Sequence, residues 1–233
     1  MIITINLRGT IGENTFAGIK SQLDASLRNK NVKGVILDIN SGGGSASASE
    51  LIYEAVSHLN ENKPVFSVVT GTAASGAYMI ACATRKIYSI HTGLIGSVGV
   101  ISMSPDVSEL LDKIGVKVNV LSKGREKASM NPFQKSTEED LLRQNVILSE
   151  IYDFFMTIVK ERRHLSDEQA SEVGNSGIYA AKEAEKLSLI DQVDSYGKII
   201  ESIKNELGEK SDPVVMKRKI PFLLRFAMKF LGQ

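Results

Sequence analysis

The sequence predicts an α/β fold built from stacked β-α-β units, and two observations lead to that prediction. Short strand-like runs alternate with longer amphipathic runs of helical length over most of the 233 residues. Polar turns that contain glycine follow several of the strand-like runs, as expected where a strand ends and a helix begins. Such units pack with right-handed crossovers. Periodicity alone would also allow a doubly wound sheet.

The N-terminal half alternates between the two kinds of element. Ile2–Leu7 alternates like a strand, and Thr15–Leu27 repeats its apolar residues at helical spacing. The same reasoning predicts the later elements of this half, which are the strand Val35–Ile39, the helix Ala46–Leu59, the strand Phe66–Val69, the helix Ser75–Ala83, and the strands Lys86–Ile90 and Val98–Ser102.

The C-terminal half is expected to be mostly helical. A long helix is predicted from Ser136 to Arg163, because acidic residues follow the Ser136 N-cap and basic residues occupy the last turn. Ser166 begins a capping box that opens another helix. The remaining expected elements are a helix near Val107–Ile114, a strand Val116–Leu121, and the helices Ala180–Leu187 and Tyr196–Leu207.

The composition is that of an ordinary globular protein. Hydrophobic residues make up 42% and charged residues 24%, and the length suits one α/β domain or slightly more. The single cysteine, Cys82, cannot form an internal disulfide, and the apolar run around it predicts a buried thiol rather than a nucleophile. One Cys and three separated His have no metal-ligand spacing, so neither a metal nor a cofactor is expected.

The end of the chain differs in character from the rest. Residues 213–233 carry five basic and no acidic side chains. Basic residues confined to this segment, without an aromatic platform, do not support nucleic-acid binding. From Ile220 the pattern predicts a short amphipathic helix, either docked on a neighbouring subunit or anchored at a membrane surface. No signal peptide or transmembrane helix is expected, which suits a peripheral membrane or cytoplasmic protein.

Four short segments carry the candidate chemistry. They are Asn40-Ser-Gly-Gly-Gly44, Gly71-Thr-Ala-Ala-Ser-Gly-Ala-Tyr78, Ile95-Gly-Ser-Val-Gly-Val100 and Ser122-Lys-Gly-Arg-Glu-Lys-Ala-Ser129. Ser75 stands between small residues at a predicted strand-to-helix turn, and a serine there becomes a nucleophile only if a base removes its proton. Histidines are few, so a lysine made less basic by burial is a candidate base.

In this order the four segments resemble the signal peptide peptidase A (SppA) family of Ser-Lys serine proteases, over roughly residues 2–200. The resemblance implies that Ser75 is the nucleophile, that Lys127 is the general base and that Ser97 holds the lysine ammonium. It also implies that Gly43 and Gly76 form the oxyanion hole. Signal peptide peptidases share a β-α superhelical core with the caseinolytic protease and the crotonases, so the implied fold is ClpP/crotonase-like with a C-terminal helical extension.

The resemblance also suggests boundaries and an activity. The expected parts are a peptidase domain over 1–205, a linker over 206–213 and a basic amphipathic tail over 214–233. The expected activity is hydrolysis of apolar peptides, such as signal peptides released in a membrane, through an acyl-enzyme. Family members form rings or domes. A homo-oligomer is therefore expected, with subunit contacts through the apolar residues of the long helix (Leu141, Val146, Ile147, Ile151, Phe154, Phe155 and Ile158).

Several alternatives remain open at this level. The family usually has Ser-Pro-Gly-Gly where this chain has Ser-Gly-Gly-Gly, and Gly42 is less rigid than proline. Lys123 shares the loop of Lys127 and competes for the role of base. His91 is another candidate, because the caseinolytic protease uses a Ser-His-Asp triad on a related core; a structural role is favoured for it. A crotonase-type acyl-CoA enzyme and a non-catalytic scaffold that binds apolar peptides are the alternative functions.

Overall fold

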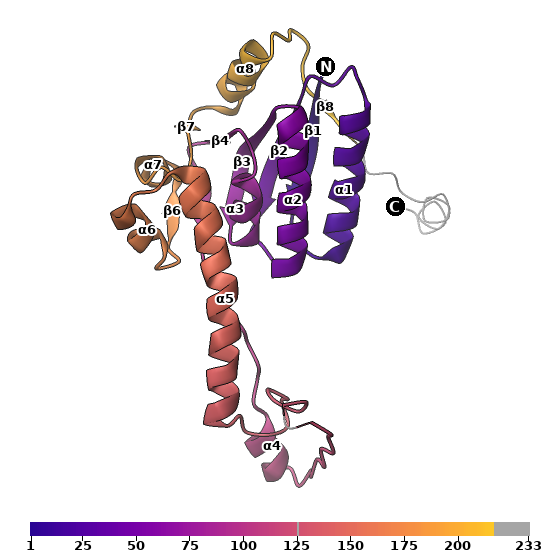
Figure 1. The fold of residues 1–233 in the computed structure, drawn as a ribbon, viewed down its shortest axis with the longest axis vertical. Coiled ribbons are helices and arrows are strands. Elements are labelled where there is room, and N and C mark those ends of the chain that lie inside the picture. Colours follow the sequence, from indigo (N-terminus) through magenta and orange to yellow (C-terminus); the bar gives the residue numbers. More distant parts are fainter. Residues whose placement is uncertain (125, 217–233) are drawn as a thin grey trace, which may run out of the picture. The chain divides into compact units, whose positions relative to one another are not determined.

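The computed structural model describes residues 1–124 and 126–216, and the chain divides into two compact units (Figure 1). The larger unit combines the N-terminal part, Met1–Val98, with the part that begins at Ile158. The smaller unit is Gly99–Thr157. Helix α5 (Glu138–Arg163) begins in the smaller unit and ends in the larger one.

Within the described residues, the larger unit is built on an eight-stranded sheet in the order β6-β5-β3-β2-β1-β8, with β4 and β7 off this path. All strand pairs are parallel except β5 with β6. The strands are β1 (Ile2–Arg8), β2 (Gly34–Ser41), β3 (Val65–Ala74), β4 (Lys86–Ser89), β5 (Leu94–Gly96), β6 (Ile178–Ala180), β7 (Gln192–Val193) and β8 (Val214–Val215).

Strand β3 changes its partner halfway along. Its first half, Phe66–Val69, pairs with β4, and Thr72–Ala74 pairs with β5. Where the register with β2 shifts, the side-chain oxygen of Asn40 accepts the Thr72 N–H at 3.1 Å. Because the strands are parallel, the turns that follow β1, β2, β3 and β5 lie at one edge of the sheet, which is where α/β proteins usually place their sites.

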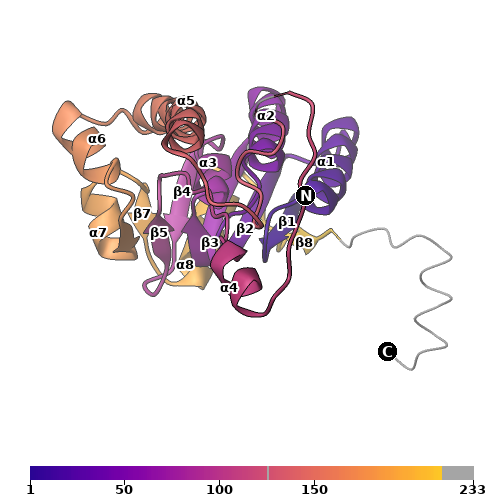
Figure 2. The same ribbon diagram turned by 90° about the horizontal axis from the view of Figure 1, so that it is seen from below.

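Helices cover both faces of this sheet. Helices α1, α2 and α3 lie on one face and α8 lies on the other, as Figures 1 and 2 show. The apolar side of α8, through Ile199 and Ile203, packs on Phe66 and its buried neighbours in the sheet. Burying a side chain of this size typically contributes about 1.5–3 kcal/mol. The helices of this unit are α1 (Glu13–Arg28), α2 (Ala46–Asn62), α3 (Gly76–Ala81), α6 (Asp167–Val173), α7 (Ala181–Lys186) and α8 (Tyr196–Glu206).

Within the described residues, the expected helices are confirmed to within a few residues at each end. The capping box at the start of α6 is present: the Ser166 hydroxyl accepts the Gln169 N–H at 3.2 Å, and the Gln169 side chain accepts the Ser166 N–H at 3.0 Å. Sequence signals of this kind are local, so they do not depend on the rest of the fold.

Two expected strands, Val98–Ser102 and Val116–Leu121, are wrong. The strand in the first region is β5, which ends at Gly96. Beyond it Val98 is buried, but Ile101 and Met103 are 79% and 84% exposed. The run Val116–Leu121 has no strand, and Leu121 is 96% exposed. Both runs have strand-like composition, but no neighbouring strand pairs with them in the described chain, and propensity alone does not make a sheet.

The smaller unit holds α4 (Ser108–Lys113) and the first part of α5. Local hydrogen bonds organise it: the Ser104 hydroxyl donates to the Met130 carbonyl at 2.6 Å, and the Val107 N–H donates to the Pro132 carbonyl at 2.8 Å. Many of its apolar side chains are exposed. Those more than half exposed are Ile101, Met103, Leu110, Ile114, Leu121, Leu141 and Leu142.

The predicted linker and tail are only partly described. Helix α8 ends at Glu206, and Val214–Val215 then pair with Ile3 and Thr4 as the edge strand β8. The first residues of the predicted tail therefore belong to the sheet. The predicted amphipathic helix from Ile220 lies outside the described residues. Among the residues that are described, no helix is long and apolar enough to cross a bilayer.

Candidate active site

Ser75 occupies a sharp turn between β3 and α3. Its φ of 53° and ψ of −129° lie in a region that residues with side chains rarely adopt, at a cost of about 1–3 kcal/mol. Three backbone hydrogen bonds hold the turn: the Ser75 N–H donates to Gly96 O at 2.9 Å, and its carbonyl accepts the N–H groups of Tyr78 at 2.9 Å and Met79 at 3.1 Å. The turn therefore keeps a half-buried serine at the end of a strand, as a nucleophile elbow does.

Helix α3 behind Ser75 is anchored in the interior. The Tyr78 hydroxyl is fully buried and donates to the Leu189 carbonyl at 2.8 Å. Nearby, the Arg163 guanidinium binds the carbonyl of Ser188 at 2.9 Å and the carboxylate of Asp191 at 3.0 Å. The Tyr78 contact joins the short helix to the C-terminal part of the larger unit, so the serine turn is not a free loop.

Cys82, at the end of the same helix, is buried as the sequence predicts. Burial raises the pKa of its thiol to about 12, with the positive charge of Arg163 acting in the opposite direction. The thiolate, which is the reactive form, is therefore almost absent near neutral pH. This environment suits a packing residue and not a nucleophile.

Two glycines approach the serine turn very closely. Gly43, in the turn after β2, has a φ of +94°, and a Cβ built on it would lie 2.8 Å from Ser75 Cβ and 2.9 Å from Gly76 N. A Cβ on Gly76 would lie 2.1 Å from the hydroxyl of Ser49. Gly43 therefore requires glycine because its backbone packs directly on the Ser75 turn, and Gly76 requires it because the Ser49 side chain fills the space that a Cβ would take.

The backbone donors at the turn are not equivalent. The Gly43 N–H donates to the hydroxyl of Ser41 at 3.1 Å. Gly76 is the first residue of α3, and N–H groups of a first helical turn have no acceptor within the helix. The assignment of Gly43 and Gly76 as oxyanion donors stays a prediction, and in this conformation the Gly43 N–H is engaged by Ser41.

Ser97 directly follows β5, the strand that carries the acceptor for the Ser75 N–H. It also has a positive φ, 51°, and its N–H donates to Gly177 O at 2.7 Å. Ser97 is therefore one residue away from the backbone contact between Gly96 and Ser75. The structure brings Ser75, Gly76, Gly43 and Ser97 to the same edge of the sheet.

The two candidate lysines belong to the smaller unit. Lys127 is exposed in a turn, where its N–H donates to Gly124 O at 3.2 Å, and Lys123 is exposed in the same loop. The neighbouring carboxylate of Glu126 lies 3.7 Å from the guanidinium of Arg143. Because Ser75 and Lys127 lie in different units, their pairing stays a prediction.

Two further expectations concern other side chains. His91 is exposed in the turn between β4 and β5, and its structural role stays a prediction. In the part of the chain that the structure describes, no group of three or more His, Cys, Asp or Glu side chains could hold a metal ion.

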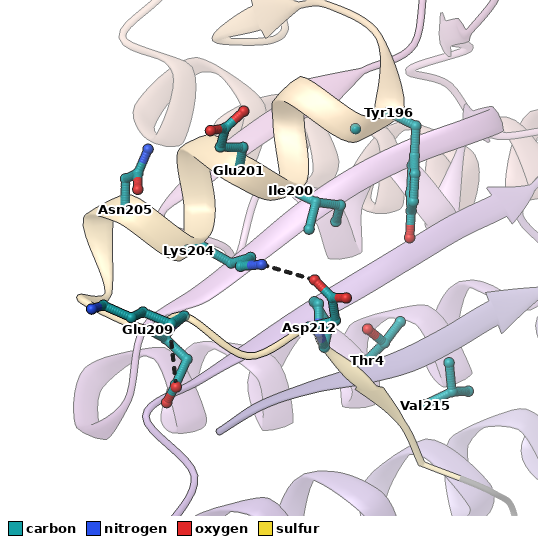
Figure 3. Close-up of a pocket in the computed structure, with 12 residues that line it drawn as sticks. Thr4, Tyr196, Ile200, Glu201, Lys204, Asn205, Glu209, Asp212 and Val215 are labelled. Carbon is teal, nitrogen blue, oxygen red and sulfur yellow. Dashed lines mark hydrogen bonds and ion pairs between the residues drawn. The ribbon is translucent and has the colours of Figure 1, made fainter.

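A cavity of about 640 Å³ lies away from these residues, beneath α8 and beside β1 and β8. Figure 3 shows its charged side chains, of which Lys204 and Asp212 pair across it at 2.8 Å. None of the residues that line the cavity belongs to the serine turn or to the glycine turn. It therefore does not support a substrate site for the chemistry considered above.

Comparison with known proteins decides the family. The family model described as peptidase family S49 matches residues 57–210, which is more than half of the chain. The chain belongs to peptidase family S49. This S49 match includes Ser75, Ser97 and Lys127. A second model, described as Clp protease, matches residues 2–97 and therefore includes Gly43.

Sequence matches to individual proteins extend over most of this chain. It is 32% identical over 214 residues to an Enterococcus faecium protein named as a candidate signal peptide peptidase SppA; the match covers 91% of this chain and 61% of that protein. It is 35% identical over 213 residues to a Brucella melitensis protein named Na(+)/H(+) antiporter NhaA, with 88% of this chain and 27% of that protein covered. The S49 chain thus spans only part of these relatives.

A solved structure confirms the fold of the S49 chain. The structure described as the 1510-N membrane-bound stomatin-specific protease S97A mutant superposes with a TM-score of 0.59 over 95% of this chain and 88% of that one. The sequence identity is 15%, so this likeness concerns the fold alone. Together with the Clp protease match, it confirms the expected ClpP-like α/β architecture.

Proposed function

We propose that the chain is a serine endopeptidase in which Ser75 is the nucleophile. The observation that carries the proposal is the conformation of Ser75: a half-buried serine, held at positive φ by three hydrogen bonds, with the backbone of Gly43 packed against it. Nothing in simple packing requires such strain, whereas a nucleophile elbow does. Membership of a peptidase family supports the same conclusion.

The proposed reaction proceeds through an acyl-enzyme. Ser75 Oγ attacks the carbonyl carbon of the scissile peptide bond while Lys127 removes the hydroxyl proton. Lys127 then returns that proton to the leaving amine, and water hydrolyses the ester in the second half of the reaction. Ser97 is proposed to orient the lysine amine through its hydroxyl, which fits its place beside the contact between Gly96 and Ser75.

The tetrahedral intermediate carries an oxyanion that needs hydrogen-bond donors. The Gly76 N–H is proposed as one donor, and an N–H of the turn over residues 42–44, with Gly43 favoured, as the other. Each such donor typically accounts for about 10²–10³-fold in kcat. Gly43 is the point at which the two turns touch, so its replacement tests the arrangement directly.

Replacement of Gly43 by alanine is expected to lower kcat by at least about 10²-fold. The added Cβ would lie 2.8–2.9 Å from atoms of the Ser75 turn, and the φ of +94° disfavours any residue with a side chain. Hydrolysis of a quenched fluorescent peptide measures the effect. Gly42→Ala is the matched control, since a Cβ there meets nothing within 4 Å, and it should keep most of the activity. Equal activity of the two variants would contradict the proposed contact.

The proposed substrates are apolar peptides, such as signal peptides released in a membrane. One E. faecium relative carries the name of a signal peptide peptidase, and the apolar side chains of the smaller unit are exposed. The direct test is whether the protein cleaves such a peptide and whether a fluorophosphonate probe labels Ser75, located by mass spectrometry. A crotonase-type acyl-CoA enzyme or a peptide-binding scaffold would give neither result.

We also propose that the chain works as a homo-oligomer, in a ring or dome. Along α5, Phe155 and Ile158 are buried, but Leu141, Val146 and Phe154 remain between 43% and 53% exposed. Exposed apolar patches on a protein often mark sites of protein–protein contact. Light scattering should therefore give a mass several times that of one chain, and an active monomer would contradict the proposal.

A further inference from the structure

Ser41 connects three backbone segments around the glycine turn. It is the last residue of β2 and only 2% exposed. Its hydroxyl donates to the carbonyl of Gly9, just after β1, at 2.6 Å and accepts the Gly43 N–H at 3.1 Å. One small side chain thus joins the ends of β1 and β2 to the turn that touches Ser75.

The turn needs such restraint, because residues 42–44 are three consecutive glycines. Glycine loses more conformational freedom on folding than any other residue, and no proline stiffens this turn. On one side, the Ile11 N–H donates to the Gly43 carbonyl at 2.9 Å. On the other side, the Ser41 hydroxyl accepts the Gly43 N–H. Together they fix the orientation of the residue whose backbone packs on the Ser75 turn.

We propose that Ser41 is a positioning residue for peptide hydrolysis, whose hydroxyl holds the glycine turn against the Ser75 turn before substrate binds. Ser41 acts through Gly43, which lies against Ser75, and does not touch the reacting atoms. The inference rests on the proposed peptidase function. Because the effect concerns the transition state, it should appear in kcat and not in substrate binding.

Three substitutions separate the hydroxyl from the packing of Ser41. Ser41→Ala removes both hydrogen bonds, and Ser41→Cys keeps a similar volume but has only a weak donor and acceptor. Both should lower kcat between about 10- and 100-fold, with KM nearly unchanged. Ser41→Thr keeps the hydroxyl and should retain most of the wild-type kcat.

A peptide boronate supplies a readout that lost stability would not move. Its tetrahedral adduct with Ser75 resembles the transition state, so its affinity should fall by the same factor as kcat/KM, while binding of a product peptide stays constant. Ser67→Ala is the matched control. Ser67 is fully buried in β3 and its hydroxyl accepts from the Thr84 hydroxyl at 3.2 Å, so this variant loses a comparable hydrogen bond without loss of kcat.

The outcomes of these measurements either support or overturn the positioning role of Ser41. Unchanged kcat in Ser41→Ala, full activity in Ser41→Cys, or an equal loss in Ser67→Ala would overturn the positioning role. A faster Ser41→Ala enzyme would overturn it too, because the hydroxyl would then be withholding the Gly43 N–H. If the wild-type protein neither cleaves peptides nor reacts with a fluorophosphonate at Ser75, the proposed function fails and the inference fails with it. Labelling of Ser75 together with an unaffected Ser41→Ala variant removes the inference alone.

Discussion

Ser75→Ala is expected to reduce peptide hydrolysis by about 10⁴-fold or more, because no acyl-enzyme can form without the hydroxyl. Alanine keeps the small Cβ that the turn accepts, and the bonds that hold the turn come from backbone groups. The fold should therefore remain, with a thermal midpoint within a few degrees of the wild type. Peptide cleavage, fluorophosphonate labelling and thermal unfolding measure the three consequences.

The control for this variant is Ser21→Ala, on the exposed side of α1. It should keep both activity and labelling. Cleavage that survives in Ser75→Ala would exclude Ser75 as the nucleophile. If instead the variant lost its thermal transition, its loss of activity would reflect unfolding. The assignment would then depend on whether fluorophosphonate labels Ser75 or another serine in the wild-type protein.

Lys127→Ala is expected to lower kcat by about 10²–10⁴-fold, the usual contribution of a general base, while Lys123→Ala keeps most of the rate. The two lysines share one exposed loop, so they form a matched pair that differs only in position. Substrate hydrolysis under saturating conditions measures the effect. Binding of a product peptide should be similar in both variants, because the amine acts on the Ser75 proton.

Two other outcomes would reassign the base. A loss confined to Lys123→Ala would move the role to Lys123. Loss of activity in His91→Ala, with Lys127→Ala unaffected, would favour a histidine mechanism like that of the caseinolytic protease. Equal activity of all three variants would leave Ser75 without any of the proposed partners and would contradict the dyad.

The helices and the central strands could be predicted because their signals are local. The Ser166 capping box and the apolar repeat of α1 depend only on neighbouring residues. Strands β6 and β7 could not be predicted. Each has two or three residues and exists only because it pairs with β5 or β4, more than eighty positions earlier in the chain. Short strands set by distant partners carry little signal of their own.

The residues of the candidate site could be named from the sequence, but the contacts between them could not. The turn residues Ser75 and Gly43 stand out through their glycine-rich surroundings, and the structure places them in contact. The role of Ser41 could not be read from the sequence, because a serine before glycines usually signals no more than a turn. Its two hydrogen bonds, to Gly9 and Gly43, depend on how the ends of β1 and β2 meet.

The contacts of the serine turn have a consequence for the order in which the chain folds during its synthesis. Ser75 is held by Gly96, the neighbouring Ser97 is held by Gly177, and Tyr78 is held by Leu189. Of these partners, Gly177 and Leu189 are added to the chain about a hundred positions after Ser75. Chains fold from the N-terminus as they emerge, and contacts between distant residues form last. The first strands and helices can therefore assemble while the Ser75 turn is still incomplete, so a nascent chain should complete this turn only after Leu189 has left the ribosome.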